Sequence, residues 1–183
     1  MTTESARLRC FRSDFLNLII LPTEACNFRC SYCYEKFEHK KMPKRVVTGI
    51  KSLIDRCGGD LNELQISWFG GEPLLAYDVV SEISRHAANV AKSKNFAFAA
   101  DMTTNGYFLN RNQFVNCLDH EIRSFQISFD GDEQTHNSSR KLASGAGTFE
   151  KIWANIMEIS KVADRFKIVL RLNYTLEIGR AHV

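Results

Sequence analysis

Five apolar segments recur along the chain, and amphipathic segments separate them. The apolar segments are rich in Ile, Val, Leu and Phe and end in turn-forming residues, which predicts strands at residues 15–21, 64–69, 96–103, 123–129 and 166–174. Between them, apolar residues recur every three or four positions, which predicts helices at residues 44–57, 79–94, 111–118 and 149–163. The alternation of strands with helices predicts the α/β fold class.

Residues at the helix starts support these boundaries. Pro43 stands where a proline of the first helical position would, and Asp78, Asn110 and Thr148 are predicted to cap the later helices. Residues 132–147 contain several Ser and Gly, and we expect them to form the longest irregular stretch, a loop that covers a substrate.

Strands that alternate with helices are joined by right-handed crossovers, so they lie parallel in one sheet. Five such strands predict a parallel sheet with helices outside it. In this arrangement the functional loops gather at the carboxyl ends of the strands. Residues that directly follow the predicted strands are therefore the first candidates for a site.

Composition and charge narrow the class of protein. The chain has 183 residues, 44% of them hydrophobic and 25% charged, which is typical of one globular domain with an ordinary core. Its 24 basic and 21 acidic residues nearly balance, which predicts no nucleic-acid partner. No apolar run approaches the length of about 18 residues that a membrane helix needs, and the first residues lack a signal peptide. We therefore expect a cytoplasmic protein with no membrane partner.

One basic cluster interrupts this balance, at Lys40, Lys41, Lys44 and Arg45. It coincides with the start of the first predicted helix. We interpret it as a solvated helix start rather than as a binding patch.

Three cysteines follow the first predicted strand at close spacing. Cys26, Cys30 and Cys33 form the pattern C-x3-C-x2-C. Three thiolates on one short loop can hold three irons of a cubane cluster and leave the fourth iron open to a small molecule. Two alternatives stay open, namely a zinc site completed by His39 and three unrelated thiols. Three more cysteines are scattered and are interpreted as reduced thiols: Cys10, Cys57 and Cys117.

Three further motifs stand where predicted strands end: Gly70-Gly71-Glu72-Pro73, Thr104-Asn105-Gly106 and Ser128-Phe129-Asp130-Gly131. Each motif alone is an ordinary turn sequence at the end of a strand. The cysteine triplet has an aromatic residue before its last cysteine, and the three motifs follow it in a fixed order. Together they resemble the sequence signature of radical S-adenosylmethionine (SAM) enzymes. The resemblance extends from about residue 15 to about residue 175. It implies an α/β fold in the form of a partial parallel (β/α) barrel of the TIM type, truncated after the fifth strand.

The resemblance implies that Cys26, Cys30 and Cys33 bind a [4Fe–4S] cluster whose open iron chelates SAM. It also assigns SAM contacts to nine residues: Tyr32, Gly70, Gly71, Glu72, Thr104, Asn105, Ser128, Asp130 and Arg140. In the family, the tyrosine lies beside the adenine. The Gly-Gly-Glu segment meets the methionine amino group, and the Thr-Asn pair lies near the same ligand.

The remaining contacts implied by the resemblance come from later segments. Ser128 and Asp130 reach the ribose or the methionine portion of SAM. Arg140 is the partner of the carboxylate, because a planar guanidinium suits bidentate binding. Arg171 or Asn173 on the fifth strand would share that role.

The activity implied by the resemblance is reductive cleavage of SAM to a 5′-deoxyadenosyl radical, with an electron supplied by a flavodoxin or ferredoxin. The residues around the motifs resemble the peptide- and protein-modifying branch, whose members carry a C-terminal SPASM extension with auxiliary clusters. This implies a peptide or protein substrate. The chain has neither that extension nor its cysteines, so inactivity of this fragment alone stays an open alternative. The alternatives are an enzyme acting on a small molecule and a non-enzymatic zinc- or iron-binding module.

The end of the chain differs in origin from the rest. Residues 178–183 match the translation of a common short-read sequencing adapter. We therefore expect three parts: a lead-in at residues 1–14, an incomplete radical SAM core at residues 15–176, and an adapter-derived tail at residues 177–183. The natural reading frame is expected to continue beyond the core.

Overall fold

The computed structural model describes residues 13–173. Five strands form the main sheet: β1 (Phe15–Ile20), β3 (Glu63–Trp68), β4 (Ala97–Thr104), β5 (Ile122–Ser128) and β7 (Lys167–Arg171). The helices are α2 (Lys44–Cys57), η1 (Pro73–Ala76), α3 (Tyr77–Lys94), α4 (Arg111–Leu118), α5 (Glu133–Ser139) and α6 (Phe149–Ile159). A small second sheet pairs β2 (Phe28–Cys30) with β6 (Arg140–Leu142). The tail at residues 177–183, most of the lead-in, and Cys10 lie outside the described residues.

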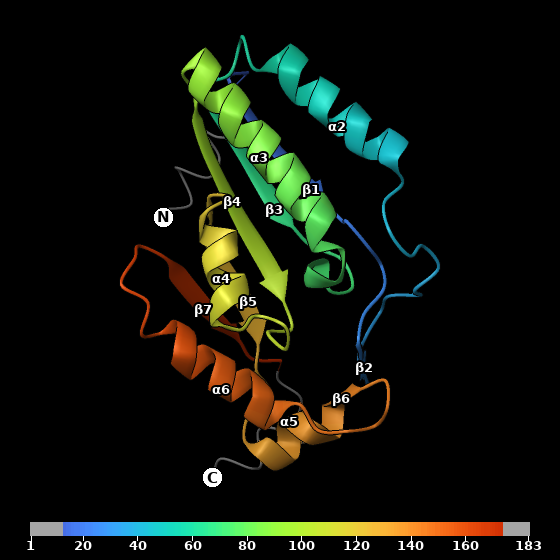
Figure 1. Cartoon of the computed structure of the whole chain (residues 1–183). Coiled ribbons are helices and arrows are strands. Elements are labelled where there is room, and N and C mark those ends of the chain that lie inside the picture. Colours follow the sequence, from blue (N-terminus) through green and yellow to red (C-terminus); the bar gives the residue numbers. More distant parts are fainter. Residues whose placement is uncertain (1–12, 174–183) are drawn as a thin grey trace.

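The main sheet has the order β1-β3-β4-β5-β7, and every neighbouring pair is parallel. This confirms the predicted α/β fold with five parallel strands. The sheet is open within the described residues, with β1 and β7 as its edges (Figure 1). Strand boundaries agree with the prediction to within about two residues, except that β7 ends at Arg171 while the predicted strand continued to residue 174, which lies outside the described residues.

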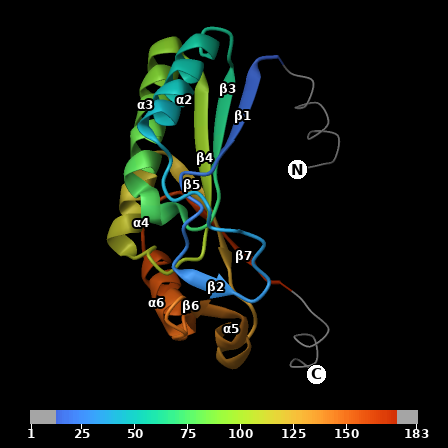
Figure 2. The same cartoon turned by 90° about the vertical axis from the view of Figure 1, so that its right-hand side faces the viewer.

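The core lies between the sheet and a single layer of helices (Figure 2). Ile66 and Trp68 of β3 are fully buried on the helix side. Gln65 and Ser67 alternate with them and face the other side, where their side chains donate hydrogen bonds of 3.0 and 2.8 Å to Asp101 of β4. This period of two places apolar residues against the helices and polar residues on the opposite face. Among residues 13–173, no helix is long and apolar enough to cross a membrane.

The predicted helix caps have mixed outcomes. Asn110 caps α4 as expected, because its side chain accepts a hydrogen bond of 3.0 Å from the backbone N–H of Gln113. Pro43 precedes α2 as its N-cap residue, one position before the place predicted for it. The prediction for Asp78 was wrong, since α3 continues directly from η1 and begins at Tyr77.

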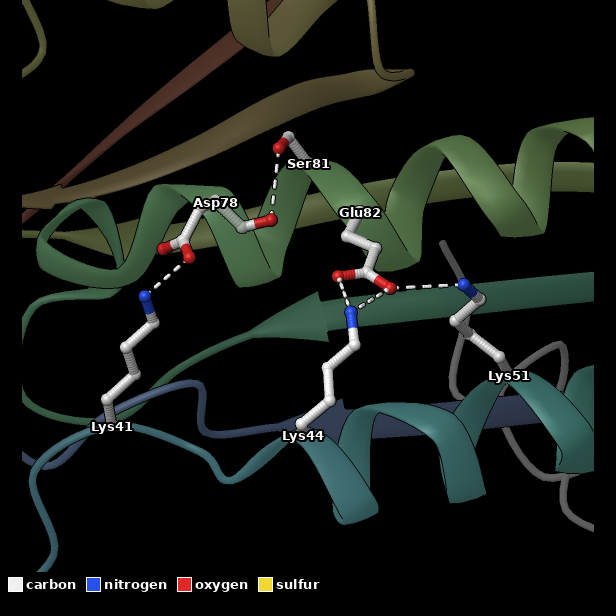
Figure 3. Close-up of polar contacts among 6 residues, drawn as sticks. All are labelled: Lys41, Lys44, Lys51, Asp78, Ser81 and Glu82. Carbon is white, nitrogen blue, oxygen red and sulfur yellow. Dashed lines mark hydrogen bonds and ion pairs between the residues drawn. The ribbon is translucent and has the colours of Figure 1, made fainter.

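Asp78 instead belongs to a row of ion pairs that joins α3 to α2 and to the segment just before α2 (Figure 3). Lys41 pairs with Asp78, while Lys44 and Lys51 both contact the carboxylate of Glu82 at 2.9 and 3.1 Å. The basic cluster at the start of α2 is exposed. Such exposed pairs orient the two helices more than they stabilise them, because water screens the charges.

Residues 132–147 are more ordered than predicted, which corrects the expectation of a long irregular loop. They contain α5 and β6, and Asp132 caps α5 by accepting a hydrogen bond of 2.8 Å from the N–H of Thr135. The prediction that Thr148 caps α6 with its side chain was also wrong. The backbone N–H groups of Thr148 and Phe149 donate to the side chain of Asn137 at 2.7 and 3.1 Å. Asn137 therefore caps α6 from the preceding helix.

Candidate functional site

The three clustered cysteines lie on the segment that leaves β1, and all three line one cavity of about 170 Å³. Cys30 ends the short strand β2, and Cys26 and Cys33 flank it. Seven of the nine residues predicted to contact SAM line the same cavity: Tyr32, Gly70, Gly71, Thr104, Asn105, Ser128 and Arg140. The structure thus brings together motifs from the ends of β1, β3, β4 and β5.

Burial disfavours the charged form of two of these thiols, those of Cys26 and Cys30. It raises the pKa of Cys26 to about 11, although its sulfur accepts a hydrogen bond of 3.3 Å from the N–H of Phe28. Burial also raises the pKa of Cys30, and the guanidinium of Arg140 opposes that shift. A bound metal would replace these protons, because the thiolate is the ligand.

The donor set consists of three thiols from one loop, which are soft ligands of the kind that iron–sulfur clusters use. Within residues 13–173, no three His, Cys, Asp or Glu side chains are grouped so that they could hold one metal ion. A cubane cluster binds each thiolate through a different iron, so it does not need such convergence. His39, the fourth ligand of the zinc alternative, is exposed and does not line the cavity.

The Gly-Gly-Glu turn packs directly against the chain that leads to Cys26. The N–H groups of Gly71 and Glu72 donate to the carbonyls of Thr23 and Ala25 at 3.1 and 2.9 Å. A Cβ atom on Gly71 would lie 2.2 Å from the carbonyl oxygen of Glu24. Only glycine allows this approach, and it fixes the start of the cysteine loop against the end of β3.

Glu72 lies behind the wall of the cavity and not in it. Its side chain is fully buried, and its oxygens accept hydrogen bonds from the N–H groups of Leu74 and Asn105 and from the hydroxyl of Thr104. Burial raises the pKa of this carboxyl, and these donors oppose the shift. Glu72 therefore holds the turn after β4 in place.

Asn105, held by Glu72, connects that turn to the cysteine loop. Its side-chain nitrogen donates to Asn27 at 2.8 Å and lies 3.8 Å from the sulfur of Cys26. Its side-chain oxygen accepts from the N–H of Tyr107 at 2.9 Å. The sequence motifs did not indicate Asn27, whose contact depends on the fold of the loop.

Asp130 is also fully buried and does not line the cavity. Its carboxylate accepts hydrogen bonds from the hydroxyl of Tyr32, from the side chain of Asn173 at 3.1 Å and from the N–H of Asn173 at 3.0 Å. Burial and the bond to Asp130 raise the pKa of Tyr32 to about 12. Asp130 thus joins the cysteine loop to the segment that follows the edge strand β7.

Arg140 projects into the cavity from β6 and is 5% exposed. In the antiparallel pairing of β2 with β6 it lies opposite Cys30. Its guanidinium donates a hydrogen bond of 2.7 Å to the hydroxyl of Tyr32 and lies 5.6 Å from the ring centre of Phe28. Its Nε is buried and has no hydrogen-bond partner among residues 13–173.

Two buried residues near the site were not predicted. Phe28 is fully buried between two of the cysteines, and its ring packs edge-on against Tyr107 at 5.9 Å. His136 is fully buried on α5. Its position six residues after Asp130 was visible in the sequence, but its burial was not, because residues 132–147 were expected to be a loop.

Comparison with known proteins agrees with this geometry. The model of the radical SAM superfamily matches residues 20–175. An S-adenosylmethionine-dependent nucleotide dehydratase of Psychrobacter lutiphocae is 30% identical over 160 residues, which cover 80% of this chain and 51% of the relative. A cysteine-type anaerobic sulfatase-maturating enzyme of Clostridium perfringens is 27% identical over 151 residues, with 75% and 39% covered. The chain therefore spans about half or less of the length of these curated relatives.

The fold itself has solved counterparts. The structure of native anSMEcpe with bound AdoMet and Kp18Cys peptide matches with a TM-score of 0.72 at 24% identity, over 84% of this chain and 42% of that one. This likeness, together with the sulfatase-maturating relative, confirms the resemblance that the motifs indicated. Because the family model matches most of the chain, the chain belongs to the radical SAM superfamily of enzymes.

Proposed function

We propose that Cys26, Cys30 and Cys33 hold a [4Fe–4S] cluster at which SAM is reductively cleaved. The observation that carries the proposal is the single cavity, because the three thiols and most of the family's SAM-contacting positions line it together. When bound, the cluster and SAM supply a 5′-deoxyadenosyl radical that abstracts a hydrogen atom from the substrate. The residues of the chain bind, orient and shield these groups.

Arg140 is the proposed partner of the SAM carboxylate. It is a buried cation at the cavity wall, and a guanidinium with an unpartnered Nε has donors left for a carboxylate. A hydrogen bond between charged groups contributes about 1.5–3 kcal/mol. Arg171 and Asn173 also line the cavity and are the secondary candidates.

The other proposed contacts surround the same space. Tyr32 is proposed beside the adenine, and the turns that contain Gly70, Gly71, Thr104 and Asn105 border the methionine portion. Ser128 is proposed to reach the ribose. We propose that Glu72 and Asp130 act from behind the wall, by holding the Thr104–Asn105 turn and Tyr32 in place.

The cavity also has a proposed role in excluding water. The rings of Phe28, Tyr34 and Phe69 belong to its lining, so much of the wall is apolar. An apolar wall strengthens electrostatic interactions inside the site and protects a reactive species from solvent. Substrate would enter from the open side, where Cys33 and Tyr34 are exposed.

For the whole protein we propose a peptide or protein substrate and a one-electron reductant such as a flavodoxin or ferredoxin. The kinship with a sulfatase-maturating enzyme supports the substrate class. A second candidate is a small-molecule substrate, which the kinship with a nucleotide dehydratase favours. Formation of 5′-deoxyadenosine that is stimulated by nucleoside triphosphates, and not by peptides, would select the second.

The test of SAM cleavage uses the anaerobically reconstituted chain with SAM and dithionite. We expect 5′-deoxyadenosine from the wild type and none from Cys30→Ala. Cys57→Ala is the matched control, since Cys57 lies on α2 away from the cavity. Equal product from Cys30→Ala and the wild type would overturn the proposal.

A further inference from the structure

A chain of three hydrogen bonds passes through the buried His136. The N–H of Asp130 donates to Nδ1 of His136 at 3.2 Å. Nε2 of His136 lies 3.0 Å from the hydroxyl of Thr148, and that hydroxyl donates to the carbonyl of Arg140 at 2.6 Å. These hydrogen bonds therefore connect the backbones of two residues at the proposed SAM site: Asp130, which follows β5, and Arg140, which begins β6.

Only one protonation state satisfies every bond in this chain. Nδ1 accepts a hydrogen bond from the backbone N–H of Asp130, so it carries no proton, and a neutral imidazole then has its proton on Nε2. The Thr148 hydroxyl accepts from that N–H and uses its own proton for the carbonyl of Arg140. Burial and the nearby Arg140 lower the pKa of His136 to about 4, against a smaller opposing effect of Asp130, so the neutral form prevails.

The two residues at the ends of this hydrogen-bond chain, Asp130 and Arg140, hold other parts of the site in place. Asp130 fixes the hydroxyl of Tyr32 and the start of the segment after β7. The backbone of Arg140 pairs with that of Cys30, which sets where its guanidinium enters the cavity. A displacement at either end would move side chains that line the cavity.

The local sequence supports this use of Thr148. Thr148 stands at the N-cap position of α6, yet its hydroxyl makes no cap bond there. The side chain of Asn137 instead accepts hydrogen bonds from the N–H groups of Thr148 and Phe149. This side chain packs closely on Gly147, where an added Cβ would come within 2.8 Å of it. The cap is thus supplied from α5, which leaves the Thr148 hydroxyl free for the chain through His136.

We propose that His136 is a positioning residue of the SAM site: in its neutral form it couples the backbones of Asp130 and Arg140 through Thr148. This inference rests on the proposed function, because it assumes that SAM occupies the cavity. His136 itself does not line the cavity, so its effect on SAM is exerted through Asp130 and Arg140.

The test compares Thr148→Val, which removes the hydroxyl at nearly constant shape, with Thr148→Ser, which keeps it. SAM affinity is measured by equilibrium dialysis on the cluster-loaded full chain. We expect Thr148→Val to weaken SAM binding about tenfold, the equivalent of about 1.4 kcal/mol, and Thr148→Ser to stay within about twofold of the wild type. Iron content is expected to be equal in all three proteins.

A control and a second readout separate positioning from general loss of stability. Ser93→Ala removes a hydroxyl that donates to the carbonyl of Val90 at 2.9 Å near the end of α3, away from the cavity, and should leave SAM affinity unchanged. Nitrogen NMR of the full chain should show the Nε2–H tautomer of His136 in both the wild type and Thr148→Val, because the N–H of Asp130 still occupies Nδ1. The Nε2 resonance should shift in Thr148→Val only, because its bond to the hydroxyl is lost.

Two outcomes are distinguishable. Wild-type affinity in Thr148→Val, or equal loss in Thr148→Val and Thr148→Ser, would overturn the positioning role while the wild type still binds SAM. A wild-type chain that takes up the cluster but binds no SAM would instead overturn the proposed function on which this inference rests.

Discussion

Gly71→Ala should damage the site through packing alone. The added Cβ would lie 2.2 Å from the carbonyl oxygen of Glu24 and 2.5 Å from that of Ala25, both of them backbone atoms. Ordinary van der Waals contact begins at 3.4 Å, so the turn must withdraw by about 1 Å. Such a withdrawal breaks the hydrogen bonds from Gly71 to Thr23 and from Glu72 to Ala25, which measure 3.1 and 2.9 Å.

The expected cost follows from these contacts. Two backbone hydrogen bonds at about 1 kcal/mol each give a loss of about 2 kcal/mol in the free energy of unfolding, before any strain is added. Gly49→Ala is the matched control, because its Cβ would meet nothing within 4 Å in the exposed part of α2. That substitution should stabilise the protein by about 1 kcal/mol, since alanine favours a helix interior.

Urea unfolding of both variants measures these energies. Iron per chain after anaerobic reconstitution measures the effect on the loop that begins at Cys26, and we expect a clear loss in Gly71→Ala only. A Gly71→Ala protein as stable as the wild type and with full iron would refute the reasoning about the Gly-Gly-Glu turn.

Two further predictions concern the buried groups behind the cavity. In Glu72→Gln the new amide nitrogen must face a backbone N–H of Leu74 or Asn105, so one hydrogen bond to the turn is lost. SAM affinity, measured by equilibrium dialysis, should therefore fall about tenfold. Unchanged affinity would contradict the role given to Glu72. The pKa of His136 is lowered in the folded state from 6.5 to about 4, so its contribution to stability is complete above about pH 6.5 and is lost as the pH falls toward 4. Urea titrations measure the free energy of unfolding at about pH 7.5 and at about pH 4.5. Between these two pH values it should fall about 2.5 kcal/mol more in the wild type than in His136→Gln. Equal falls in the two proteins would contradict this prediction.

Much of the main sheet could be predicted from local patterns. Runs of Ile, Val, Leu and Phe with turn residues after them identify buried parallel strands, and the crossover rule then brings their carboxyl ends together. For that reason the sequence alone was enough to place Gly70, Thr104 and Ser128 near Cys26, and all four residues line the cavity. The chemistry of the site followed from the fold class and the motif order.

The segment between β5 and α6 could not be predicted in the same way. Strand β6 has three residues and pairs with β2 across more than a hundred positions of sequence, so no local periodicity reveals it. Helix α5 is short and polar, and its only fully buried side chain is His136. Its order comes from tertiary hydrogen bonds, which propensity does not encode.

The positions of Glu72 and Asp130 illustrate the same limit. Their motifs predicted their neighbourhood correctly, but both carboxylates are satisfied by their own chain behind the wall of the cavity. Whether a motif carboxylate faces the ligand or supports the wall depends on side-chain packing, which a motif does not specify.

The most direct measurement of the central claim is the iron and sulfide content of the anaerobically purified chain. The account predicts about four iron and four sulfide per wild-type chain, broad absorption near about 400 nm, and loss of both in Cys30→Ala but not in Cys57→Ala. Stoichiometric colourless zinc in the wild type, or full iron in Cys30→Ala, would contradict it.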